Sequence, residues 1–265
     1  NTISNKQLKI RKNIKEENIK EIENSLSRDE IINLIYKYSK NVTIPGFKLV
    51  NKAPINYVMD MLLKIKNMKH SLNNEFLNPV NLEKEYVFNE YNPVVVENVV
   101  TKDIHEIIDE YFKTNIKNKV YTLGDRQSKR YKILDEIMTR LLHLEFLPLI
   151  EKIVGKKMKP TYTYLSAYIK GSDLPAHTDR AECEYTCSYI IGKPQNSNWN
   201  IYVDKRKRPK KYEGRVNFIP PKEECIAVDC NENGLMIFNG TDHPHYREPL
   251  EHEYYNIVLL HYCSK

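Results

Sequence analysis

The stretch YIKGSDLPAHTDR, residues 168–180, decides the fold when it is read together with GTDHPHYRE, residues 240–248. The first segment holds a His-x-Asp triplet, His177 and Asp179, and the second supplies His245. Residues i and i+2 of an extended segment point to the same side, so the triplet can hold one metal ion from one strand end. Two imidazoles and one carboxylate are the ligand set of a non-haem Fe(II) centre with open coordination positions. A barrel that brings the second segment alongside the first would complete this set.

The surroundings of the triplet distinguish a site from a chance pair of surface residues. A turn with glycine and proline, residues 171–175, follows a tyrosine-rich strand pattern, and a second strand pattern, EYTCSYII, comes after the triplet. Turn residues between two such runs place the polar triplet at the end of a sheet. We therefore expect the triplet at the mouth of a β-structure, where binding sites concentrate.

The chain after Pro160 reads as strands throughout. Tyr162, Tyr164 and Tyr168 alternate at period two with smaller or apolar residues, which predicts one face directed inward. Short strands separated by turn residues are typical of a jelly-roll sandwich or barrel. The further strands are expected at 184–191, 199–204, 225–229, 235–239 and 255–262.

With these segments in place, the chain resembles the Fe(II)/2-oxoglutarate-dependent dioxygenase superfamily, in the neighbourhood of its prolyl-hydroxylase-like members. The resemblance covers 158–262 and holds in order and spacing. The matching segments are PTYTYLSAYIKG, LPAHTDRAECEYTCSYII, NWNIYVD, GLMIFNGTDHPHYREPL and YYNIVLLHY. It implies an α+β fold: a double-stranded β-helix core (jelly-roll or cupin-like) with flanking and N-terminal helices.

The same resemblance implies a chemistry. His177, Asp179 and His245 match the family's facial triad and so are the expected metal ligands and catalytic residues. Fe(II) and 2-oxoglutarate are the implied cofactors, with O2 as co-substrate. The implied reaction is hydroxylation of an unactivated C–H bond of a small molecule, amino acid or peptidyl side chain, with release of succinate and CO2. Halogenating relatives carry a small residue where this chain has Asp179, so halogenation is not expected.

The far carboxylate of 2-oxoglutarate requires a cation, and arginine suits it because its planar fork binds carboxylate bidentately. Where the family usually carries Lys or Arg, ten residues after His245, this chain has Tyr255. Arg247, two residues from the metal ligand, is the first candidate, and a surface ion pair with a nearby glutamate is its alternative. The further candidates for binding 2-oxoglutarate are Arg180, Tyr168 and Tyr164.

Two other metal arrangements compete with the triad. His243 precedes His245 by two residues, but Pro244 disfavours regular strand geometry between them, and the resemblance places the ligand before an aromatic–arginine pair. Cys183 and Cys187 offer two thiolates for zinc, although a second pair of ligands is lacking. We expect both cysteines to be residues of the barrel instead, with free, partly buried thiols.

The first part of the chain reads as helical, and the expected division is an N-terminal helical extension over 1–90 and an oxygenase domain with supporting helices over 91–265. A capping-box pattern at Ser27 and Glu30 predicts one helix, and Pro54 opens a second that runs to about Met68. We expect this extension to cover the barrel or to mediate a homodimer through its helices.

Between the extension and the strands, a β-branched run in 91–100 predicts a strand, and a helix is expected after Thr101. The segment 124–155 reads as one or two helices, interrupted near Pro148 and closed by Gly155. Asp125 and Arg126 are then expected just before a helix. They are candidate substrate-binding residues, with a charge pair at a helix N-terminus as the alternative.

Composition agrees with a globular enzyme: of 265 residues, 41% are hydrophobic and 29% charged, and no apolar run reaches the ~20 residues of a membrane span. Five cysteines without a C-x-x-C pair, together with a polar start of the sequence, favour a reducing cytoplasmic setting and no membrane partner. The partners expected are 2-oxoglutarate and an unidentified substrate.

The basic run DKRKRPKK, residues 204–211, is read as a solvated hairpin tip. Its functional alternative is an electrostatic surface for nucleic acid or an anionic sugar, although a net charge of +6 is modest for a dedicated nucleic-acid-binding protein. A different class of function is a non-catalytic metal-containing β-helix that binds its ligand without turnover.

Overall fold

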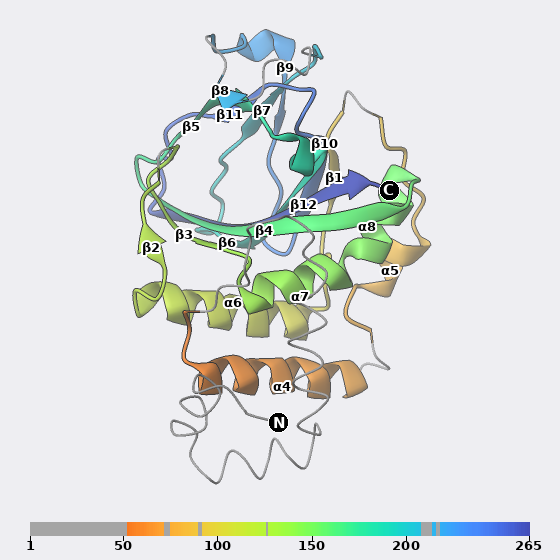
Figure 1. The fold of residues 1–265 in the computed structure, drawn as a ribbon, viewed down its shortest axis with the longest axis vertical. Helices are drawn as coiled ribbons and strands as arrows, with labels where there is room; N and C mark the ends of the chain where they lie inside the picture. The colour runs from red at the N-terminus through yellow and green to blue at the C-terminus, as the bar shows by residue number, and fades with distance from the viewer. Residues whose placement is uncertain (1–51, 72–74, 90–91, 126, 208–213, 216–217) are drawn as a thin grey trace, which may run out of the picture.

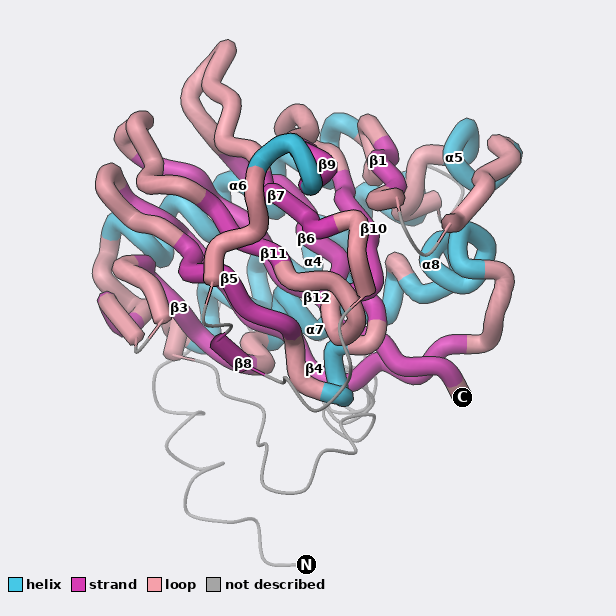
Figure 2. Tube along the Cα trace, turned by 90° about the horizontal axis from the view of Figure 1, so that it is seen from above, coloured by secondary structure: helices cyan, strands magenta, loops and turns pink. Residues whose placement is uncertain are grey.

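Two antiparallel β-sheets face each other, and helices cover the outer face of the larger sheet (Figure 1). The computed structural model describes residues 52–265 apart from 72–74, 90–91, 126, 208–213 and 216–217. The seven-stranded sheet has the order β1-β10-β6-β12-β4-β3-β2, and the five-stranded sheet has the order β8-β5-β11-β7-β9. Seen from above, the small sheet lies over the large one, with helices beyond it (Figure 2).

From β4 onward, the main strands pass back and forth between the two sheets, except that β7 and β9 follow each other in the small sheet, which is the winding of a double-stranded β-helix. β4, β6, β10 and β12 belong to the large sheet, and β5, β7, β9 and β11 belong to the small one. The bounds are β1 Val94–Val96, β2 Thr122–Leu123, β3 Arg130–Leu134, β4 Met158–Ile169, β5 Leu174–Thr178, β6 Tyr185–Gly192, β7 Ile201–Asp204, β8 Gly214–Arg215, β9 Cys225–Val228, β10 Leu235–Asn239, β11 His245–Arg247 and β12 Tyr254–Ser264.

The period-two pattern of β4 has the predicted consequence. Tyr162, Tyr164 and Tyr168 face the space between the sheets, whereas Leu165 is buried in the core against the helices. All five further strands predicted after β4 are present, with bounds shifted by no more than two residues. The α+β double-stranded β-helix expected from the sequence is therefore the observed architecture.

The helices are α4 Ile55–Ser71, α5 Pro79–Glu83, α6 Lys102–Lys117, α7 Ile137–Glu145 and α8 Leu147–Val154. The break between α7 and α8 lies where Pro148 predicted it, and Gly155 ends α8 with a left-handed φ of 73° that favours glycine. The prediction that the segment 124–155 is helical throughout is wrong before residue 137. Residues 130–134 instead form β3, because backbone pairing with β4 overrides the helical propensity of this segment.

Two apolar clusters hold these layers together. One lies between the large sheet and the helices, where Ile108 and Leu142 are fully buried, and the other lies between the two sheets, around Trp199 and Phe238. α6 and α7 pack on the large sheet, and α4 lies outside them (Figure 1). The helices therefore support the β-helix from the side of the large sheet.

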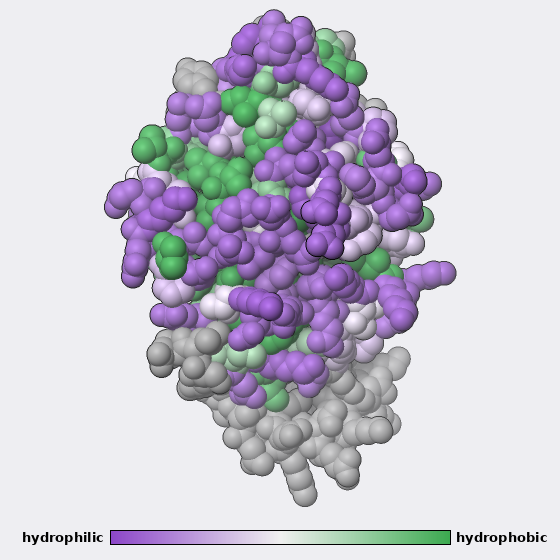
Figure 3. Space-filling model, turned by 180° about the vertical axis from the view of Figure 1, so that it is seen from behind, coloured by the Kyte–Doolittle hydropathy of each residue, from purple (hydrophilic) through white to green (hydrophobic). Residues whose placement is uncertain are grey.

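The rear surface is mostly hydrophilic, and its hydrophobic residues gather mainly in the upper part of the view (Figure 3). None of the described helices has both the length and the apolar character needed to cross a bilayer. The helix predicted after Ser27 lies outside the described residues, and the domain division at residue 90 and the dimer through the N-terminal helices remain predictions. The helix predicted from Pro54 is α4, which extends three residues further than expected.

Candidate metal centre and cavity

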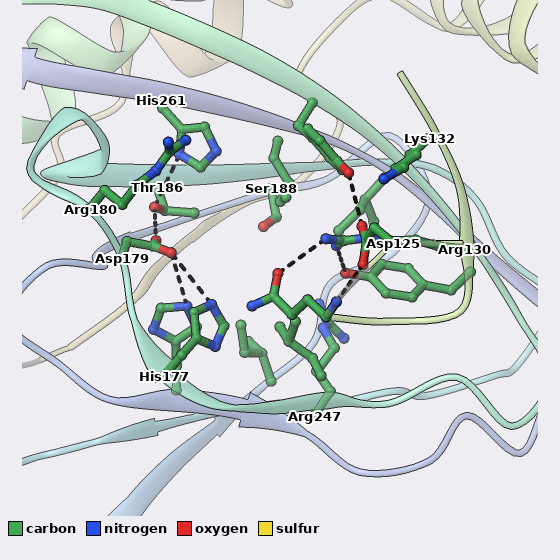
Figure 4. Close-up of a pocket in the computed structure, with 18 of the residues that line it drawn as sticks. Asp125, Arg130, Lys132, His177, Asp179, Arg180, Thr186, Ser188, Arg247 and His261 are labelled. Carbon is green, nitrogen blue, oxygen red and sulfur yellow. Dashed lines mark hydrogen bonds and ion pairs between the residues drawn. The ribbon is translucent and has the colours of Figure 1, made fainter. Parts of the chain in front are cut away.

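Three predicted ligands converge at one end of the small sheet. His177 lies on β5, Asp179 directly follows that strand, and His245 begins β11, which pairs with β5 so that the two histidines are directly opposite. The Nε2 atoms of His177 and His245 lie 3.5 and 3.7 Å from the same Asp179 oxygen, Oδ1 (Figure 4). Two atoms each about 2.1 Å from one ion are at most about 4.2 Å apart, so both separations allow a shared metal.

The orientation of both imidazoles is set by the main chain. Nδ1 of His177 is 2.8 Å from the carbonyl oxygen of Pro175, and Nδ1 of His245 is 3.0 Å from that of His243. A carbonyl only accepts, so each Nδ1 carries the proton and each Nε2 presents its lone pair to the ion. Burial and the neighbouring His177 lower the pKa of His245 to about 4, so this ring is neutral and ready to bind a metal at neutral pH.

Two hydrogen bonds hold Asp179 in place. Its backbone N–H donates to the carbonyl of Gly240 at 2.8 Å, and its Oδ2 accepts a 2.5 Å hydrogen bond from Thr186. Burial alone would raise the pKa of this carboxyl, but His245 and His177 outweigh burial and hold the pKa below its usual range. Gly240 leaves the space that the carboxylate fills, because a Cβ at that position would overlap Asp179 Oδ2 and approach Thr186 Oγ1 to 2.7 Å. Sequence reasoning identified neither Thr186 nor Gly240.

A second group of potential ligands shares Asp179 and adds Cys183 and His261. Burial raises the pKa of the Cys183 thiol, which contacts the Tyr162 hydroxyl at 2.9 Å, so the thiolate that a metal requires is disfavoured. His261 is predicted as a core or supporting residue, and its Nδ1 lies 3.3 Å from Thr186. The nitrogen and oxygen donors of the triad suit Fe(II), whereas the second group does not present a ready sulfur ligand.

The triad opens into a cavity of about 600 Å³ between the two sheets. Apolar side chains from both sheets, among them Ile201, Phe238 and Ile257, form much of its wall. Its charged groups come from separate elements, and Figure 4 shows the triad at one end and the β3 residues at the other. The charged residues of the wall, besides the ligands, are Asp125, Arg130, Lys132, Arg180 and Arg247.

Arg247 is the predicted cation, and it lies inside the protein with 2% of its surface exposed. Its guanidinium lies 4.5 Å from the ring centre of Trp199 and 5.1 Å from that of Tyr255, and its Nη1 donates to the Trp199 carbonyl. Nη2 is buried without a hydrogen-bond partner among the described residues. The surface ion pair with a neighbouring glutamate, which was its alternative, does not form in the described part of the chain.

The other predicted 2-oxoglutarate residues are less available. Arg180 is exposed and lies over the Tyr162 ring at 5.1 Å. The Tyr164 hydroxyl donates to Asp125, and the Tyr168 hydroxyl accepts from Arg130 at 2.6 Å. Arg130, which sequence reasoning missed, is 4% exposed and lines the cavity, but Asp125 already neutralises it. The signal that could have found it is the alternation of charged and apolar residues in RYKIL, residues 130–134.

Of the two residues predicted to bind substrate, the structure describes Asp125 and not Arg126. Asp125 lines the cavity, but it lies in the connection between β2 and β3 and not before a helix, because 130–134 form a strand. Arg126 lies outside the described residues. The charge pair expected for Asp125 exists with a different partner, Arg130, whose Nε lies 2.9 Å from Oδ2.

The two metal arrangements that compete with the triad in the sequence do not form in the described part of the chain. The Nδ1 atom of His243 lies 2.7 Å from the carbonyl oxygen of Asp204, and His243 is not part of the ligand cluster. All five cysteines are free thiols, as expected, and Cys187 lies in β6, where it is fully buried and not partly buried as predicted. In the basic run, Arg206 pairs with Asp204 and with Glu224, so its charge is compensated locally. Residues 208–211 of the run lie outside the described part.

Comparisons with known proteins define the fold. No family model matches the chain, and no curated protein is similar to it in sequence. Among solved structures, EctD from S. alaskensis in its apo form is 12% identical, covers 67% of this chain and 74% of its own, and has a TM-score of 0.51. SnoK, a non-haem alpha-ketoglutarate-dependent carbocyclase from nogalamycin biosynthesis, is 10% identical, covers 65% and 79%, and has a TM-score of 0.50. A Pseudomonas putida prolyl-4-hydroxylase is 7% identical, covers 65% and 92%, and has a TM-score of 0.47.

The fold and the site together define a class. The chain has the double-stranded β-helix fold of the 2-oxoglutarate–Fe(II) oxygenases, as the similarity to SnoK shows. In the wall of the cavity between its two sheets, the chain carries a His-Asp-His cluster able to hold a metal ion.

Proposed function

We propose that this protein is an Fe(II)- and 2-oxoglutarate-dependent oxygenase that hydroxylates an unactivated C–H bond of a small molecule, amino acid or peptidyl side chain, with release of succinate and CO2. The observation that carries the proposal is the convergence of His177, Asp179 and His245 on one point of the cavity wall. Three protein ligands in this arrangement leave coordination positions open on the cavity side. Iron and 2-oxoglutarate, when bound, supply the oxidising chemistry, and the protein positions the reactants and excludes water.

Arg247 is the residue we assign to the far carboxylate of 2-oxoglutarate. A buried guanidinium without a carboxylate partner is costly, and its unpaired Nη2 group adds a further desolvation penalty. A carboxylate that enters the cavity would satisfy both. Trp199 and Tyr255 contact each other edge to face at 5.3 Å and both lie against the guanidinium, so the two rings restrict its orientation in advance. Tyr168 contacts Trp199 edge to face, with ring centres 4.8 Å apart, and so lies beside this subsite, where its hydroxyl can add a hydrogen bond.

The remaining wall residues fit a reaction that must be shielded from water. Leu174, Ile201 and Phe238 are apolar members of the cavity wall, and Phe238 packs edge-on against His245 with ring centres 4.9 Å apart, which limits the access of water to that ligand. Thr186 holds the Asp179 carboxylate, so this ligand keeps its position while the other coordination positions exchange. The side chain at Asp179 itself favours hydroxylation, because a carboxylate occupies the position that is open in halogenating enzymes.

The first test is anaerobic visible absorption of the protein after addition of Fe(II) and then 2-oxoglutarate. The expected result is a weak metal-to-ligand charge-transfer band that is absent in Asp179→Ala. Folded, iron-loaded protein without this band would refute the proposal and leave the non-catalytic binding module as the better description. Alanine at His177 or His245 should likewise abolish iron binding.

The assignment of Arg247 has a separate readout. Arg247→Leu should raise the 2-oxoglutarate concentration at which the charge-transfer band reaches half of its full intensity by at least about tenfold. A change of this size is expected from the loss of a charge-assisted hydrogen bond. Iron affinity should stay close to that of the wild type, because Arg247 is not a ligand. Arg180→Leu is the matched control, and a larger effect at Arg180 than at Arg247 would reverse the assignment.

A further inference from the structure

The cavity end distant from the triad is rich in hydrogen-bond donors and poor in free acceptors. This end is formed by β3 and by the segment that leads into it, with Gln127, Arg130 and Lys132 in the wall. Figure 4 shows Lys132 beside Asp125 and Arg130, on the far side of the cavity from His177 and Asp179. Asp125 is the one carboxylate of this end among the described lining residues.

Asp125 is fully committed to the protein. Its Oδ1 accepts from the backbone N–H groups of Gln127 at 2.8 Å and Ser128 at 2.7 Å, and its Oδ2 accepts from Arg130 Nε and the Tyr164 hydroxyl, both at 2.9 Å. Burial would raise the pKa of this carboxyl, but Arg130 and these donors lower it to about 2. Asp125 therefore neutralises Arg130 and has no free lone pair to offer an incoming cation.

The same network orients Gln127. Nη2 of Arg130 donates to Gln127 Oε1 at 3.2 Å, and a guanidinium can only donate, so the amide oxygen must face Arg130. The amide NH2 group is then on the side turned away from Arg130, in a residue that lines the cavity. Lys132 lines the same end, half-buried, and forms no ion pair with the described residues.

This step rests on the proposed function. With Fe(II) and 2-oxoglutarate bound, the cavity wall would contain more positive than negative charges. Asp125 neutralises Arg130, the far carboxylate of 2-oxoglutarate neutralises Arg247, and Asp179 with the near carboxylate matches the two charges of Fe(II). Lys132 at the far end and the exposed Arg180 near the triad then have no negative partner in the cavity wall. An ammonium and an amide donor that face a partly desolvated cavity favour a ligand with an anionic oxygen group.

We infer that the substrate is a small anion, a carboxylate or a phosphate monoester, whose charged group is bound by Gln127 and Lys132 while its other end faces the triad. The cavity volume of about 600 Å³ is in the range of small-molecule sites. Gln127 and Lys132 are therefore specificity-determining residues. Asp125 and Arg130 position them and do not contact the substrate's charge.

The test uses the anaerobic Fe(II) and 2-oxoglutarate complex at saturating 2-oxoglutarate. Hexanoate, hexyl phosphate, hexanamide and hexylammonium are titrated by calorimetry, and the charge-transfer band is recorded in parallel. At least one of the two anions should bind at least about tenfold more tightly than hexanamide. One charge-assisted hydrogen bond accounts for a difference in affinity of this size. The stronger of the two identifies carboxylate or phosphate. Equal binding of anion and amide, or no anion binding, overturns the inference.

Variants locate the contact. Lys132→Glu should lose the anion preference and bind hexylammonium more tightly than hexanoate, and Gln127→Leu should weaken anion binding about tenfold. Lys159→Met, at an exposed position of β4 outside the cavity, is the matched control and should leave all four affinities unchanged. Unchanged anion binding in Lys132→Glu would overturn the assignment. A wild-type protein without the charge-transfer band would instead refute the proposed function, so the two failures are distinguishable.

Discussion

Gly240→Ala should disable the metal centre without touching a ligand. The added methyl group would overlap Asp179 Oδ2, lie 2.7 Å from Thr186 Oγ1 and lie 3.0 Å from Asp179 Cγ. All three distances are shorter than ordinary van der Waals contact, so the carboxylate must move by roughly 1 Å, a displacement that can cost about 100-fold in a functional site. The φ of Gly240 does not lie in the left-handed region, so alanine adds no backbone strain and the effect is steric.

The expected result is a metal affinity about 100-fold weaker than that of the wild type, or about 2.7 kcal/mol. The assay is calorimetric titration of the apoprotein with Co(II), with the visible d–d spectrum as a second reading of the ligand set. Gly192→Ala is the control, since the nearest atom to its new methyl group would be Asp109 Oδ1 at 3.2 Å, in a side chain that is far from the metal ligands. Wild-type affinity in folded Gly240→Ala would refute the packing argument.

Three further predictions concern the support of the site and of the fold. Thr186→Val keeps the side-chain shape but removes the hydrogen bond to Asp179, and titration with Co(II) should show about tenfold weaker binding. His243→Ala should retain metal binding but lower the free energy of unfolding by about 1 kcal/mol, because its hydrogen bond to the Asp204 carbonyl is lost; loss of metal binding would contradict the ligand assignment. Burial raises the pKa of Glu136 from 4.5 to about 7, so the folded state holds a proton that the unfolded chain releases. Relative to Glu136→Gln, the wild type should therefore lose up to about 3 kcal/mol of unfolding free energy between pH 4.5 and 7 in denaturant titrations, and parallel profiles would contradict this.

The strands and the placement of His177 beside Asp179 were predictable because they depend on local periodicity. Side chains alternate along β4 and β6, and His177 and Asp179 share one side of an extended segment, so sequence spacing alone places them. The distant ligand His245 required the family resemblance, because no local pattern says which strand will pair with β5. His243 was set aside on the geometry of Pro244, and the structure shows its Nδ1 hydrogen-bonded to a carbonyl outside the cluster.

The far end of the cavity was not predictable for a physical reason. β3 is a short strand directly before α7, and the helix-favouring residues that follow it extend the helical pattern backwards through 130–134. Its strand state comes from pairing with β4, a contact across many residues of sequence. Arg130 and Lys132 thus face the cavity through tertiary pairing. Thr186 and Gly240 are common residues in strands and turns, and only the three-dimensional contact with Asp179 shows their role.

The main-chain carbonyls that orient His177 and His245 have an evolutionary consequence. Each acceptor belongs to the residue two positions earlier in the chain, and a peptide oxygen is retained under any substitution. The direction of both imidazoles is therefore inherited with the backbone of β5 and β11 and does not depend on a partner side chain that could drift. Substitutions on β3 can change which ligands fit the cavity, while the two imidazoles keep their orientation. New substrates can therefore be acquired without a change in the metal centre.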